Sequence, residues 1–157
     1  MPQAYMPAND APSSKLATAF VTIRDRRYEM LNMKEFEGKM NIKTEEVPTL
    51  GRTVNGRKPV GAEIKWKAVV YHCAEIFDEV AETYKNTGLM PPIEIQTTNE
   101  DPATSIGRST KVYTDCIIDG DILLSLLNAE GGFVEQTIEG YAMDFTRPEK
   151  YKTPDYM

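Results

Sequence analysis

The residues of this 157-residue chain that could do acid–base or redox chemistry are few and scattered. Its one histidine, His72, stands beside Cys73, and the other cysteine, Cys116, lies far along the chain. Because no CxxC spacing is present, we expect no disulfide framework and no sulfur-rich metal site, and we predict that both cysteines are reduced and buried. A lone histidine at a strand end is more often a packed or capping residue than a catalyst. No catalytic triad is therefore predicted.

The candidate ligands for a metal ion are two acidic pairs, Glu45-Glu46 and Asp119/Asp121. Neither pair has partner ligands at a recognisable spacing, so solvated surface charge explains them better. The sequence predicts no metal site.

A phosphate loop is superficially suggested by the glycines at 51 and 56 in G-R-T-V-N-G-R-K. The Walker pattern requires Gly-Lys-Ser/Thr leading into a helix, whereas here Arg57 follows Gly56 and a strand is expected after it. Asn55-Gly56 is better explained as a tight turn, because both residues tolerate positive φ. We therefore expect no enzyme activity, no catalytic residue and no cofactor.

Composition favours one soluble domain. The chain is 41% hydrophobic and carries 18 basic and 24 acidic residues, for a net charge of −6. Its sequence pI is near 4.9, which argues against a surface that holds nucleic-acid phosphates tightly. No apolar run is long enough to span a bilayer and no signal peptide is apparent at the start, so a cytoplasmic protein with no membrane contact is expected.

Two long alternating segments flank the loop from Val47 to Gly61. Between Tyr28 and Val47 the apolar residues share one parity and the charged residues share the other, and the alternation returns from Ala62 to Tyr71. We predict that these strands pair as a long hairpin. At about 3.3 Å per residue, a ten-residue strand spans roughly 33 Å, so the loop should stand well away from the sheet.

The remaining pattern predicts further strands and one helix. Strands are expected at 18–25, 93–97, 108–118 and 133–146, and the polar residues Arg24-Asp25-Arg26-Arg27 are expected to form the turn that ends the first strand. A helix is expected at 73–88, where apolar residues fall at helical spacing, with Gly88 as its C-cap. Residues 119–130 could form a buried strand or a short Asp-capped helix, and we favour the strand.

The predicted fold class is mainly β, a β-rich α+β protein. It is an antiparallel β-sandwich or barrel with one flanking α-helix and a long projecting hairpin loop. We divide the chain into a flexible N-terminal arm (1–16), a single domain (17–147) and a C-terminal tail (148–157). The arm is either disordered or ordered against a neighbouring subunit.

Charge is distributed unevenly between the loop and the rest of the chain. Arg52, Arg57 and Lys58 give the loop +3 of a net −6, so the remainder carries −9. A basic arm on an acidic body is the pattern expected when the arm of one copy docks onto the next, and such head-to-tail contacts build rings or filaments. A merely solvated loop is the alternative. The predicted inter-subunit residues are Pro48, Leu50, Arg52, Val54, Arg57 and Lys58.

The order of the segments also carries a resemblance. In sequence they are a strand ending in E-E-V-P, the loop G-R-T-V-N-G-R-K-P-V-G, the strand I-K-W-K-A-V-V-Y-H, the helix A-E-I-F-D-E-V-A-E-T-Y, then P-P-I-E-I-Q, D-P-A-T-S-I-G-R-S-T-K-V-Y-T-D-C-I-I-D, and E-G-Y-A-M-D-F-T-R-P-E-K. This succession, over about residues 17 to 150, resembles the tail tube proteins of contractile-tailed phages and phage-like particles. The proline-rich N-terminal segment and G-Y-A-M-D-F depart from the family's pattern.

The resemblance implies a structural virion protein. Six copies would close into a ring, and rings would stack into a hollow tail tube through which DNA passes. The implied partners are other copies of the chain, the tail sheath, a baseplate or tube initiator, the tape measure and the tail terminator. The implied location is the virion tail, assembled in the host bacterial cytoplasm. An adaptor, connector or tail-completion protein that forms a single ring is the alternative.

The same resemblance predicts which charges face the DNA. A weakly attractive lumen lets a polyanion slide without specific binding, whereas a basic lumen would hold it through many phosphate contacts. The expected lumen acids lie on the polar faces of the strands: Glu35, Glu37, Glu63 and Glu139.

Overall fold

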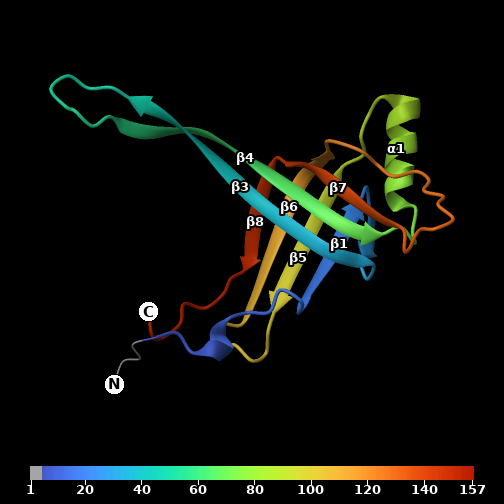
Figure 1. The fold of residues 1–157 in the computed structure, drawn as a ribbon, viewed down its shortest axis with the longest axis horizontal. Helices are drawn as coiled ribbons and strands as arrows, with labels where there is room; N and C mark the ends of the chain where they lie inside the picture. The colour runs from blue at the N-terminus through green and yellow to red at the C-terminus, as the bar shows by residue number, and fades with distance from the viewer. Residues whose placement is uncertain (1–4) are drawn as a thin grey trace.

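The chain forms a strongly bent antiparallel sheet with one α-helix, and a computed structural model describes residues 5–157 (Figure 1). Its strands are β1 (Ala17–Ile23), β2 (Arg26–Glu29), β3 (Met33–Val47), β4 (Gly56–Tyr71), β5 (Ile93–Glu100), β6 (Arg108–Ile118), β7 (Glu135–Ala142) and β8 (Asp144–Glu149). The helix α1 spans Ile76–Thr87, and a short 3-10 helix spans Ala8–Asp10. The strand order is β2-β1-β5-β6-β7-β4-β3, with β8 paired to β6. The predicted β-rich class, with one helix, is confirmed.

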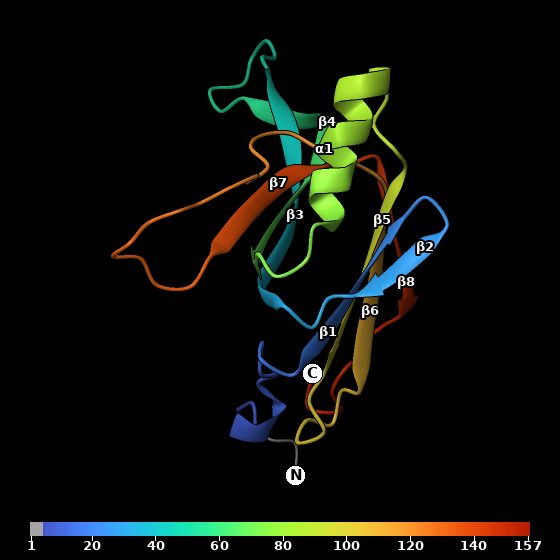
Figure 2. The same cartoon turned by 90° about the vertical axis from the view of Figure 1, so that its right-hand side faces the viewer.

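Strand β6 joins the two halves of the sheet. Most of its length pairs with β5 and β8, while its last residues, Ile117 and Ile118, pair with β7. Beyond this junction β7 crosses the direction of β1, β5 and β6 in Figure 1, and it runs obliquely to the near-vertical β6 in Figure 2. Gly140 makes the junction possible, because a Cβ added there would overlap the carbonyl oxygen of Ile117. The two halves therefore face each other as a sandwich that is not closed into a barrel.

The core lies between these halves. Each half contributes fully buried aliphatic side chains, and the helix adds Phe77 and Val80. Among the most deeply buried residues are Val21, Ile93 and Ile95 from one half, with Val70 and Ile138 from the other. Gly88 ends the helix in the left-handed conformation (φ 73°), and its N–H bonds the carbonyl of Tyr84 at 2.8 Å.

The β3–β4 hairpin extends far beyond the core (Figure 1). The two strands pair from Met33↔Val70 out to Val47↔Gly56, but β7 covers β4 only from Ile64 to Tyr71. Past that point no strand among the described residues neighbours the ribbon, and β3 is exposed from Lys39 onward. The predicted projecting hairpin is confirmed.

Several local predictions are wrong. Residues 119–130 form neither the favoured strand nor a helix, because no strand of the described chain pairs with them and they run as a loop from the end of β6 toward the start of β7. The polar Arg26 and Arg27, predicted to be a turn, begin strand β2. The final strand does not run unbroken from 133 to 146; it is interrupted at Met143, where the chain passes from β7 to β8 and continues to Glu149. Cys73 is exposed, whereas Cys116 is buried as predicted.

The described part of the N-terminal segment packs on its own domain. The carboxylate of Asp10, 8% exposed, accepts hydrogen bonds at 3.0 Å from the backbone N–H and the hydroxyl of Ser105. The Ser105 N–H is the main cause of a lowered pKa of Asp10. The Ser13 N–H donates to Asp101 at 3.1 Å. The division into arm, domain and tail stays a prediction, and residues 1–4 of the arm lie outside the described residues.

Candidate assembly surfaces

The hairpin tip, residues Val47–Lys58, carries exposed apolar side chains at the far end of the ribbon. Leu50 is 102% exposed and Val54 is 70% exposed. Pro48 also lies in this loop and is exposed, and Gly51 turns the backbone with φ of 79°. No part of the chain from residue 5 to 157 covers these side chains, so they contribute almost nothing to the stability of the subunit.

The pairing of β3 with β4 places acidic residues opposite two of the three basic residues of the loop. Lys58 lies opposite Glu45 and Arg57 lies opposite Glu46, while the Arg57 guanidinium donates to the Thr44 hydroxyl at 3.0 Å. Arg52 instead lies in the turn, outside the paired register. The local +3 is thus largely offset by the two glutamates on the facing strand, and Arg52 is the cation that the fold presents at the tip. A charge count restricted to the loop leaves out these two glutamates, because they belong to the facing strand β3.

A second candidate surface is the polar face of β3, β4 and β7. The register places Glu37 opposite Lys67 and Lys67 opposite Glu139, so these side chains share one face. Alternation along the strands brings Glu35 and Glu63 to the same face. The fold therefore gathers the four predicted lumen acids on one surface.

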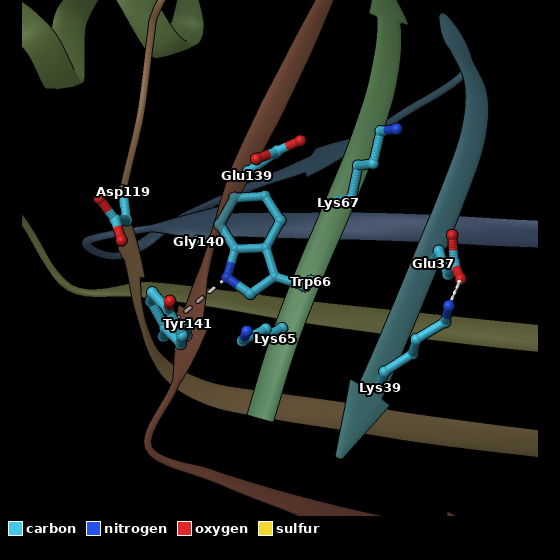
Figure 3. A pocket seen from close by; sticks show the side chains of 9 residues that line it. All are labelled: Glu37, Lys39, Lys65, Trp66, Lys67, Asp119, Glu139, Gly140 and Tyr141. Carbon is cyan, nitrogen blue, oxygen red and sulfur yellow. Dashed lines mark hydrogen bonds and ion pairs between the residues drawn. The ribbon is translucent and has the colours of Figure 1, made fainter. Parts of the chain in front are cut away.

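Lysines are interleaved with these acids. Lys39 and Lys65 oppose each other across β3 and β4, and Lys39 forms an ion pair with Glu37 that is drawn in Figure 3. Lys43 pairs with Glu63 at 3.1 Å. Hydrogen bonds from these lysines are the main causes of lowered pKa values for Glu37 and Glu63, which stay ionised. The face alternates in charge and is not simply acidic.

A hollow of about 310 Å³ opens beside this face (Figure 3). The buried Trp66 is one of its lining residues, and the Trp66 indole N–H donates to the Tyr141 carbonyl at 3.2 Å. Asp119 and Glu139 line it together with Lys65 and Lys67. The mixed charges make it a continuation of the alternating polar face.

The residues that could do chemistry do not converge. Within residues 5–157 no group of three or more His, Cys, Asp or Glu side chains could hold a metal ion. His72 Nε2 lies 3.4 Å from an Asp78 carboxylate oxygen in the first turn of α1, an arrangement typical of a packed histidine at a helix start. No helix in the described part of the chain is both long and apolar enough to cross a membrane.

Comparison with known proteins places the chain in a family. A model of the phage tail tube protein family matches residues 4–146, and the chain belongs to this family. It is therefore a structural component of a phage-type tail and not an enzyme. A search of curated protein sequences found no match.

Solved structures share the fold at low sequence identity. A chain in the six-fold symmetrised baseplate of the anti-feeding prophage superposes with a TM-score of 0.66 at 7% identity, over 91% of this chain and 96% of that one. A chain in the tube-terminating cap of the same particle gives 0.59 at 13% identity, over 92% and 91%. A chain in the PVC sheath–tube complex, an extracellular contractile injection system, gives 0.56 at 12% identity, over 92% of both chains.

Proposed function

We propose that this protein polymerises as stacked hexameric rings into the inner tube of a phage tail, and that DNA is delivered through the tube. The observation that carries the proposal is the long hairpin with its exposed apolar and cationic tip. A chain in the six-fold symmetrised baseplate and one in the sheath–tube complex share the fold, which supports a six-membered ring.

The hairpin is understandable as an assembly arm. A two-stranded ribbon without a packed face is marginal alone, and an edge strand such as β3 offers unpaired backbone groups to other chains. Docking on another copy would cover both the edge and the tip. Docking of the tip on a different surface of the next copy makes the interface head-to-tail, and such an interface closes rings or extends filaments.

The alternating polar face is suited to line the bore. Glu35, Glu37, Glu63 and Glu139 would repel phosphates, while the lysines beside them would keep the repulsion modest. Phosphate binding scales with the number of unpaired cations contacted, so lysines already paired with glutamates bind DNA weakly. DNA would then slide without specific binding. The tail sheath, tube initiator, tape measure and terminator are the proposed partners, with assembly in the host cytoplasm.

Electron microscopy of the purified protein at high concentration tests the proposal. Rings or tubes with a central channel are expected, and a protein that stays monomeric under all conditions, with or without a tail initiator, would overturn it. Replacing Arg52, Arg57 and Lys58 together by Glu should block stacking while the urea midpoint of the monomer stays near that of the wild type. A matched variant, R52K/R57K/K58R, keeps the charge and should still form tubes. Normal tubes from the triple Glu variant would refute tip docking.

A single-ring adaptor, connector or tail-completion protein is the second candidate. It is favoured by the likeness to the tube-terminating cap chain, whose TM-score of 0.59 is close to the 0.56 of the sheath–tube chain. Isolated rings that never stack, even at high concentration or on a tail initiator, would favour this candidate over the tube.

A further inference from the structure

The β6–β7 loop, residues 119–134, leaves large apolar side chains exposed in the part of the chain that the structure describes. It has no strand or helix, although it contains several leucines. Leu127 is 95% exposed, Phe133 is 89% exposed and Leu124 is 63% exposed. A loop that exposes three large apolar side chains is a candidate interaction surface.

The charges of this loop are all of one sign. Asp119, Asp121 and Glu130 lie within it, and it contains no lysine or arginine. A hollow of about 580 Å³ lies between the loop and the start of β7, with Asp121, Leu124 and Gln136 among its lining residues.

The hairpin tip has the complementary character. It combines exposed Leu50 and Val54 with Arg52, the cation outside the paired register. Figure 1 places the tip and the β6–β7 loop at opposite ends of the long axis of the molecule. The two surfaces cannot meet within one subunit, whereas a copy displaced along this axis brings them together.

We propose that the β6–β7 loop is the acceptor for the hairpin tip of another copy of this chain. Leu50 and Val54 pack against Leu124, Leu127 and Phe133, and Arg52 pairs with Asp121. The inference rests on the proposed function, since it names the partner surface of the same assembly arm. In this arrangement the apolar contact supplies most of the binding free energy, and the Arg52–Asp121 pair orients the two surfaces.

Disulfide trapping tests the contact. In a Cys73→Ser background, with the remaining Cys116 buried, the double variant Leu50→Cys/Leu127→Cys should form inter-subunit disulfides on mild oxidation of assembled material, giving a ladder on a non-reducing gel. Disulfide formation requires Cβ atoms about 3.5–4.5 Å apart, so the ladder reports close approach. The matched control Leu50→Cys/Leu16→Cys places the second thiol at another exposed leucine, 45% exposed and just before β1, and should give no ladder.

Charge exchange gives an independent readout. Arg52→Glu alone and Asp121→Arg alone should each raise the concentration needed for assembly about tenfold, and the double variant should restore it. Tubes that form normally without a disulfide ladder and without charge rescue would overturn the acceptor assignment and leave the tube function standing. Failure of the wild-type protein to assemble at all would overturn the proposed function itself.

Discussion

Replacing Leu50 by Ala separates the stability of the subunit from the stability of the tube. Leu50 is 102% exposed, so truncation removes no packing in the isolated subunit, and its unfolding free energy should change by less than about 0.5 kcal/mol. If the side chain is buried against another copy, three carbons leave an apolar contact at about 0.8 kcal/mol each, a loss of about 2 kcal/mol per added subunit. Since 1.4 kcal/mol is tenfold, the concentration that supports assembly should rise about 30-fold.

The assay measures the concentration of protein left in the supernatant after tubes are pelleted at equilibrium. Urea unfolding of the subunit is measured in parallel. Leu31→Ala is the matched control, because Leu31 is 83% exposed in the β2–β3 connection, outside the tip. That control should alter neither quantity. An unchanged supernatant concentration for Leu50→Ala would show that the tip is solvated in the tube and that the docking argument is wrong.

Three further predictions concern the domain itself. Gly140→Ala should lower the free energy of unfolding by about 1–3 kcal/mol through overlap with the β6 carbonyl, whereas Gly61→Ala, with nothing within 4 Å, should be nearly neutral in the same urea titration. Folding lowers the pKa of Asp10, so its contribution to stability is present above the unfolded pKa of about 3.9 and is lost as pH falls through the folded value. Asp10→Asn should therefore make the free energy of unfolding depend less steeply on pH in the acid range. The same variant should be cleaved faster by protease near the N-terminus. Burial raises the pKa of Cys116 to about 12 and keeps its thiol protonated, so a thiol reagent at pH 8 should label one cysteine per native chain, Cys73, and both after denaturation.

Hydrophobic periodicity correctly predicted the elements whose sequences follow one period over many residues. The hairpin strands, β6 and the helix follow from alternation or helical spacing over many residues, and Gly88 marked the helix end. The short strands β1 and β5 were also predicted, whereas the segment after β1 was not. Arg26 and Arg27 form strand because β1 offers a paired edge, which no local signal reveals.

Residues 119–130 show why periodicity fails in an apolar segment. Leucines there favoured a buried strand, yet Leu127 is almost fully exposed, because β7 enters the sheet only at Glu135. Cys73 was predicted buried from its residue type, but it follows the end of β4 where the chain leaves the sheet. In both cases burial is decided by where the neighbouring strands end.

The sequence by itself determined the β-rich class, the projecting hairpin and the family, because each rests on patterns that extend over many adjacent residues. Only the tertiary structure determines which charged side chains lie opposite one another. Glu45 and Glu46 oppose Lys58 and Arg57 only once the hairpin register is set, which leaves Arg52 as the cation at the turn. Likewise, the four lumen candidates share one face with lysines because β3, β4 and β7 align residues that are far apart in the chain. Charge pairing depends on distances of a few ångströms across strands, and those distances are fixed by register and not by spacing along the sequence.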